Sequence, residues 1–114
     1  MRSIWLSLLF ALPSVAFAEE GWLGFSQRVE VSWLLNVESA VVNAVAKGSP
    51  AEKAGIAIGD VFMSVEGCAI PGCGAYKAQG LMKKAVGEVL RLTLKRQNGE
   101  EYEAVLVAEP RPKQ

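Results

Sequence analysis

Two cysteines are the residues of this sequence with the most evident chemistry. Cys68 and Cys73 are its only cysteines, and four residues separate them. Pro71-Gly72 lies between them and predicts a turn that brings the two thiols together. In an oxidising compartment such a pair predicts a local disulfide, which stabilises a fold by about 2 kcal/mol. A redox-active pair is the alternative, although the spacing differs from the Cys-x-x-Cys of thiol–disulfide oxidoreductases.

Histidine is absent from the 114 residues, and this absence excludes several kinds of catalytic and metal site. It excludes Ser-His-Asp and Cys-His hydrolysis, a histidine general base and most zinc sites. Twelve basic residues balance twelve acidic ones, so no strong field directs the protein to nucleic acid. The sequence therefore predicts a protein that is not an enzyme and that binds no cofactor, no metal and no nucleic acid.

Residues 1–18 have the features of a secretory signal peptide. Arg2 is followed by an apolar run from Ile4 to Leu12, and Ala16-Phe17-Ala18 is a small-x-small cleavage site. The run is shorter than the roughly 20 apolar residues of a membrane-spanning helix. We therefore expect cleavage after Ala18 and a periplasmic or secreted protein. An uncleaved membrane anchor is the alternative.

The chain after residue 18 predicts short strands and, near its middle, a very short helix. Residues 26–31 and 40–45 favour strands, whereas residues 32–39 fit no element clearly. Ser49-Pro50-Ala51-Glu52 is a capping box, so a helix of about one and a half turns is expected from Ser49 to Gly55. Val61 to Val65 favours the next strand.

A longer helix and a hairpin are predicted in the last third of the chain. Residues 75–85 favour a helix. Residues 89–96 and 101–107 each alternate between apolar and polar side chains, and Asn98-Gly99 between them is a two-residue hairpin turn. These elements predict one α+β domain over residues 19–108, followed by a loose C-terminal tail over residues 109–114.

The run from Val45 to Phe62 carries residues in an order typical of bacterial PDZ domains. It contains Gly-Ser-Pro-Ala at 48–51, Ala-Gly at 54–55 and Gly-Asp at 59–60, before an apolar strand. The leucines at 90, 92 and 94, followed by Asn98-Gly99, fit the late hairpin of the same family. Gly21-Trp22-Leu23-Gly24-Phe25 is similar to its Gly-Leu-Gly-Phe carboxylate-binding loop. The sequence thus resembles a stand-alone PDZ domain, similar to those of envelope serine proteases.

The resemblance implies both a fold and a ligand. The fold would be a small, partly open β-barrel or sandwich of about five or six strands with one short and one longer helix. The ligand would be the C-terminus or an extended segment of another protein, added as an antiparallel strand beside residues 25–29. The N–H groups of Leu23, Gly24 and Phe25 would bind the terminal carboxylate. The groove would be lined by Gln27, Val29, Tyr76, Gly80, Met82 and Lys83.

Three functions are compatible with these features. The first is binding to the C-termini or extended segments of envelope proteins, as an accessory to a protease or secretion system. The second is thiol–disulfide exchange by Cys68 and Cys73. The third is a structural or oligomerisation scaffold without a free ligand, which an exposed Trp22 or Trp33 would favour. No stable membrane insertion is expected once the signal peptide is removed.

Overall fold

The computed structural model describes residues 19–112, so the expected signal peptide lies outside the described residues. The described chain forms strands and two helices, which confirms the α+β class. The strands are β1 (Phe25–Val31), β2 (Val37–Val45), β3 (Val61–Val65), β4 (Cys68–Ala69), β5 (Val89–Lys95) and β6 (Glu101–Val107). The helices are α1 (Pro50–Lys53) and α2 (Ala75–Met82).

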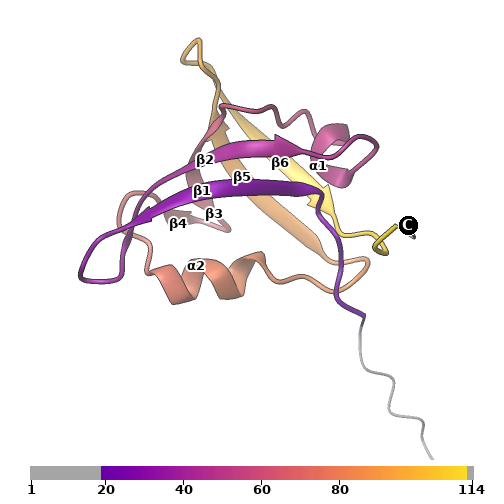
Figure 1. Ribbon diagram of the computed structural model, residues 1–114, viewed down its shortest axis with the longest axis horizontal. Coiled ribbons are helices and arrows are strands. Elements are labelled where there is room, and N and C mark those ends of the chain that lie inside the picture. Colours follow the sequence, from indigo (N-terminus) through magenta and orange to yellow (C-terminus); the bar gives the residue numbers. More distant parts are fainter. Residues whose placement is uncertain (1–18, 113–114) are drawn as a thin grey trace, which may run out of the picture.

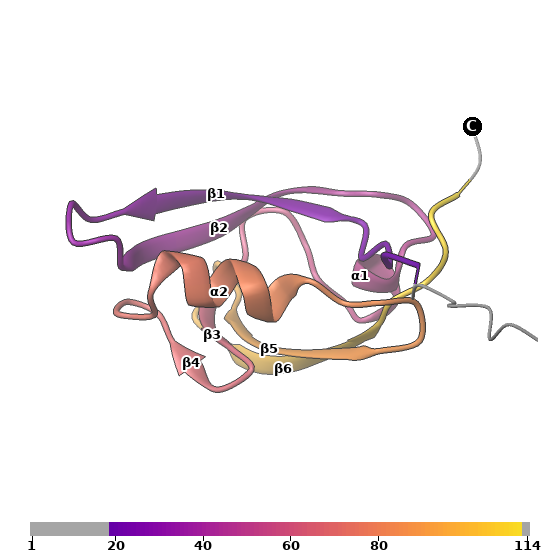
Figure 2. The same cartoon turned by 90° about the horizontal axis from the view of Figure 1, so that it is seen from below.

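One curled sheet contains all of these strands (Figure 1). Its pairings are antiparallel, and the longer strands follow the order β1-β2-β3-β5-β6, with the short β4 paired to β3. β1 and β6 are therefore its edges. α2 runs beside β1 and β2, and α1 lies toward the other end of the molecule (Figure 2). This is the partly open sheet with one short and one longer helix that the sequence predicts.

Alternating side chains of the sheet build the core. Leu90, Leu92 and Leu94 of β5 are buried and pack with Ala104 and Leu106 of β6, whereas the valines of β6 face solvent. Successive strand residues point to opposite faces of a sheet. A slip of one residue between β5 and β6 would therefore bring charged residues into the core, and this fixes the register of the hairpin.

Side-chain caps fix the start of α1, which is a single turn. Ser49 is buried, and its Oγ accepts a hydrogen bond from the N–H of Glu52 at 3.1 Å, as the capping box predicts. The Glu52 carboxylate accepts from the N–H of Gly48 at 2.7 Å, one residue before the usual position. Gly55 has a φ of +87° and ends the turn in the left-handed conformation, as expected.

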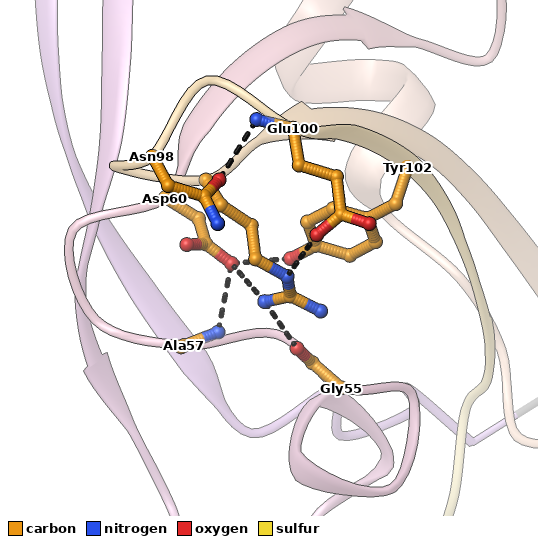
Figure 3. A network of polar contacts seen from close by, with 7 residues as sticks. Gly55, Ala57, Asp60, Asn98, Glu100 and Tyr102 are labelled. Atoms are coloured by element: carbon orange, nitrogen blue, oxygen red, sulfur yellow. Dashed lines mark hydrogen bonds and ion pairs between the residues drawn. The ribbon is translucent and has the colours of Figure 1, made fainter.

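A buried carboxylate connects the loop after α1 to the last hairpin (Figure 3). Asp60 is 2% exposed, and its Oδ2 accepts hydrogen bonds from the Tyr102 hydroxyl and from the N–H of Ala57 at 3.0 Å. Arg96 Nη1 lies 3.3 Å from the same oxygen and donates to the Gly55 carbonyl at 3.1 Å. The Arg96 guanidinium also covers the Tyr102 ring, 4.0 Å from its centroid. Burial, together with the Asp60 carboxylate, raises the pKa of Tyr102, so its hydroxyl stays protonated.

α2 is shorter than the sequence predicts, because its last residue is Met82 rather than residue 85. The residues that follow leave the helix to contact the start of the domain. The N–H of Gly21 donates to the Lys84 carbonyl at 2.8 Å, and Glu20 pairs with Ala85. A contact between distant parts of the chain therefore ends this helix, and no local stop signal predicts it.

Two further segments differ from the sequence-based expectations. Residues 32–36, for which the sequence predicts no clear element, form the turn of the β1–β2 hairpin. Glu109, expected in the tail, pairs with Trp22 through two main-chain hydrogen bonds of 2.7 and 3.1 Å. Residue 109 is thus part of the folded domain.

Candidate functional site

A groove lies between β1 and α2. β1 is an edge strand, so one of its sides pairs with β2 while the other faces α2 (Figure 2). Two hollows open along this groove, and side chains of both elements line each of them. An open strand edge beside a helix is an arrangement that can accept an extended peptide as an additional strand.

The larger hollow, about 580 Å³, lies at the start of β1. Residues 20–25 form one wall, and the last turn of α2 with the two residues after it forms another. Lys83 and Arg111 are exposed in its lining and make no ion pair within residues 19–112. Since Glu20 is the acidic residue of this lining, the rim carries a positive charge excess that suits an anion.

Lys84 also lines this hollow, but its charge is partly compensated. Its Nζ lies 3.5 Å from a carboxylate oxygen of Glu66, which also accepts the N–H of Arg91 at 3.0 Å. The main-chain donor of Arg91 and then the Lys84 ammonium hold the pKa of Glu66 below its ordinary value. Lys83 and Arg111 are therefore the cations more available to a ligand.

The second hollow, about 300 Å³, lies farther along the groove and is mostly apolar. Its floor consists of side chains of the core, and its two sides come from β1 and α2. The hollows share Gln27, Gln79 and Met82, so they are adjacent. The remaining residues that line the second hollow are Val29, Val37, Ala40, Phe62, Ile70, Ala75 and Ala78.

The loop before β1 contains main-chain N–H groups without an acceptor among residues 19–112. Among the described residues, the N–H groups of Leu23 and Gly24 donate to no acceptor. Gly24 accepts the N–H of Ala46, so the next pair, Phe25 and Val45, is a non-hydrogen-bonded pair of the ladder. The N–H of Phe25 therefore points away from β2. Three successive donors are left for a ligand, beside a positive rim.

The carbonyl groups of the same loop bind the protein and hold the loop in place. The Leu23 carbonyl accepts the N–H of Ala51, in the first turn of α1, at 3.0 Å, and the Gly24 carbonyl accepts that of Ala46 at 2.7 Å. Gly24 has a φ of +86°, and a Cβ there would lie 2.0 Å from the Cβ of Ser49. Only glycine fits this position, because α1 packs directly against the loop.

The structure places most of the expected groove residues on the lining. Phe25 packs on Phe62, with 5.8 Å between the ring centroids, and lines the larger hollow with Leu23 and Gly24. Gln27 and Met82 line both hollows, Val29 lines the apolar one and Lys83 the larger one.

Two expected groove residues lie elsewhere. Tyr76 is 75% exposed, and neither Tyr76 nor Gly80 lines a hollow. Ala75 and Gln79, each one residue earlier, take these places. α2 starts at Ala75, as predicted, so the difference lies in which face of the helix points to the groove. The N–H of Ala75 donates to the Leu35 carbonyl at 2.7 Å. The spacing of Ala75, Ala78, Gln79 and Met82 is helical and was a signal for the correct face.

Cys68 and Cys73 form a disulfide, as the sequence predicts. It joins β4 to the turn before α2, and the main chain of this turn also bonds to β2: the N–H of Val37 donates to the Cys73 carbonyl at 2.7 Å. The disulfide therefore lies at the N-terminal anchor of the helical wall. Cys73 is buried, which limits the access that thiol–disulfide exchange requires.

Within residues 19–112, no helix is long and apolar enough to cross a membrane. No group of three or more Cys, Asp or Glu side chains in this range is arranged to hold a metal ion.

A family model described as PDZ domain matches residues 41–96. The chain belongs to the PDZ domain family. The match begins in β2 and ends after β5, so it includes α1 and α2 but not the loop before β1. No curated protein matches the sequence.

Solved structures share the fold, and two of them are isolated PDZ domains. The photosystem II D1 C-terminal processing protease matches with a TM-score of 0.65 and 24% identity over 83% of this chain, but over only 24% of its own. The PDZ domain of a Vibrio cholerae carboxy-terminal protease, solved with a peptide, has a TM-score of 0.61 and 17% identity over 84% of this chain and 100% of its own. The HtrA3 PDZ domain, bound to a phage-derived ligand, has a TM-score of 0.57 and 22% identity over 82% of this chain and 88% of its own.

These comparisons bear on the class of protein. The isolated PDZ domains among them are binding modules rather than catalytic domains. The chain spans about a quarter of the processing protease, 24% of its length, so the likeness covers a part of that enzyme.

Proposed function

We propose that the protein binds the C-termini of other polypeptides in the groove between β1 and α2. The observation that supports this most directly is the loop of Leu23, Gly24 and Phe25, whose N–H groups are left free beside an open strand edge. Successive main-chain donors in a tight turn form a site for a carboxylate. The exposed Lys83 and Arg111 add the matching charge.

The two hollows set the kind of side chains that the ligand presents. In an extended strand every second residue points to the same face, about 7 Å apart. With the carboxylate on the loop, the last side chain enters the larger hollow and the third from the end enters the apolar one. The main chain between them pairs with β1, which supplies hydrogen bonds without regard to sequence.

The test is a set of peptides with free and amidated C-termini, titrated against the chain from Glu19. All described strands, both helices and the core lie within this part. We expect micromolar binding of free peptides that carry apolar residues at the last and third-last positions. Amidation removes the charge and one acceptor, so it should weaken binding by roughly 100-fold. Equal binding of both forms would contradict carboxylate recognition.

A pair of variants on α2 locates the site. Ala78→Leu fills the apolar hollow, so peptide affinity should fall by at least about tenfold, the equivalent of 1.4 kcal/mol. Lys77→Leu is the matched control, because Lys77 is exposed on the same helix and lines neither hollow. An equal loss in both variants would place the ligand elsewhere.

We also propose that the natural partners are envelope proteins and that the protein serves as an accessory to a protease or secretion system. The proposal depends on the signal peptide expected over residues 1–18. N-terminal sequencing of the protein recovered after expression in a bacterial host should give Glu19 as the first residue. Recovery of Met1 in the cytoplasmic fraction would contradict the location.

A further inference from the structure

The tip of the β1–β2 hairpin presents three large apolar side chains to solvent. Trp33 is 89% exposed, Leu34 is 63% exposed and Leu35 is 51% exposed. The hairpin extends beyond the rest of the described chain, at the end opposite α1 (Figure 2). The tip, residues 32–36, does not line the peptide groove.

The tip of the hairpin carries no charged side chain. Charged residues make up 21% of the sequence, yet none lies between Glu30 and Glu38. These two glutamates are exposed on β1 and β2 and border the tip on both strands. The surface thus changes from charged to apolar along the hairpin, toward its end.

The main chain of the tip is largely closed by its own hydrogen bonds. The N–H of Ser32 donates to the Asn36 carbonyl, and that of Leu35 donates to the Ser32 carbonyl, both at 2.8 Å. The N–H of Asn36 donates to the Ser32 hydroxyl at 3.2 Å. Transfer to an apolar medium is costly for unpaired main-chain groups. Among residues 32–36 these are the groups of Trp33 and Leu34, for which no partner lies within residues 19–112, so in a bilayer the main chain of the tip would stay at headgroup depth while its side chains reach deeper.

Leu35 has two energetically unfavourable features: its backbone conformation and the exposure of its side chain. Its φ is +65°, a conformation in which glycine or asparagine is the usual residue. Half of its apolar side chain is also exposed. An apolar surrounding at this position would remove the second cost.

A second aromatic residue lies at the same end. The Leu35 carbonyl accepts the N–H of Ala75, so Tyr76 at the start of α2 is close to the tip, and 75% of it is exposed. Tryptophan and tyrosine are enriched where the hydrocarbon of a bilayer meets its headgroups. Leucines inserted between such aromatic residues reach the acyl chains.

We infer that the hairpin tip docks into the interface of a phospholipid bilayer, with Trp33, Leu34 and Leu35 as the inserted side chains. A second copy of the chain fits less well, because a stable dimer interface needs about 20–30 residues on each side and the tip offers a few on a convex end. The absence of charge on the tip also means that anionic lipid is not required. The association is peripheral, and it is independent of peptide binding.

The experiment is co-sedimentation of the chain from Glu19 with phosphatidylethanolamine–phosphatidylcholine vesicles. The chain is cut at this residue because the apolar run before it would bind lipid by itself. We expect binding that changes little with salt, and a loss of roughly tenfold for each large side chain removed by Trp33→Ser or Leu34→Ser. Ile58→Ser is the matched control, since Ile58 and Leu34 are both 63% exposed. It should leave binding unchanged.

Fluorescence adds a readout of position. In a Trp22→Phe background, Trp33 is the only tryptophan after residue 18. Its emission should shift to the blue on addition of vesicles, and brominated lipids should quench it. The proposal is overturned if vesicles do not sediment the chain. It is also overturned if Ile58→Ser weakens binding as much as Leu34→Ser, or if binding requires phosphatidylglycerol and disappears at high salt. A concentration-dependent dimer that Trp33→Ser dissociates would overturn it in favour of a second copy.

Discussion

The two helices of this domain are held against the sheet in different ways. α1 begins with a side-chain cap at Ser49 and buries Pro50 and Ala51. The loop that follows it is connected through Asp60 to Arg96, just after β5, and to Tyr102 of β6. α2 is twice as long, but its N-cap is a glycine without a side-chain bond, and Ala78 is its buried residue. Two hollows separate it from β1. The comparison indicates that α1 belongs to the rigid core, whereas α2 is a wall fixed mainly at its ends, with room for a ligand.

The largest effect is expected where the loop contacts α1. Gly24→Val introduces a side chain at positive φ and places its Cβ against the Cβ of Ser49. Strain and overpacking together should destabilise the domain by about 4 kcal/mol or prevent folding. Urea unfolding followed by circular dichroism measures this. A stably folded variant would show that α1 can move away from the loop and does not belong to the rigid core.

The next largest effect concerns the polar network behind α1. Asp60→Ala removes the common acceptor of Ala57, Arg96 and Tyr102 and should cost about 3 kcal/mol. Tyr102→Phe removes one bond and should cost about 1 kcal/mol. Both variants should bind peptide with unchanged affinity at a temperature where they are folded. A loss of affinity at full folding would mean that the α1 side and the groove are coupled.

Reduction of the disulfide tests the anchor of α2. Loss of the Cys68–Cys73 bond should cost about 2 kcal/mol in unfolding free energy. It should also weaken peptide binding, because the turn that carries Cys73 positions the first residues of the helical wall. Thermal unfolding and peptide titration with and without reductant measure the two effects. Unchanged affinity after reduction would show that the main-chain bonds to β2 are sufficient to hold α2.

The smallest effect is a stabilisation. Gly80 lies inside α2, and a Cβ there meets no atom within 4 Å. Gly80→Ala should therefore stabilise the domain by up to about 1 kcal/mol. Peptide affinity should not change, since Gly80 lines neither hollow. A weaker affinity would favour the helix face expected from the sequence over the one in the structure.

Local spacing allowed parts of this molecule to be predicted. The cap of α1 needs only Ser49 and Glu52, and the last hairpin needs only Asn98-Gly99 between two alternating strands. Both features depend on contacts between residues close in sequence, so the local residue pattern is sufficient to predict them. The disulfide across a short turn belongs to the same class.

The predicted face of α2 differs from the one in the structure, although Ala75, Ala78, Gln79 and Met82 have helical spacing. The helix has one strongly buried position, so its apolar pattern is weak, and Tyr76 and Gly80 were expected where Ala75 and Gln79 lie. The start of the helix at Ala75 was predicted, but the bond of its N–H to the Leu35 carbonyl of a distant hairpin was not. Glu109 is similar, because its partner Trp22 is at the other end of the domain sequence. Contacts of this kind leave no periodic signal.

The pairing of Trp22 with Glu109 has a consequence for how such a domain is used. Trp22, near the start of the domain, and Glu109, near its end, therefore lie side by side. A domain whose two ends are adjacent can be inserted into a surface loop of a larger protein, or circularly permuted, without breaking a strand. This agrees with the occurrence of the same fold within a protease chain of which it covers 24%.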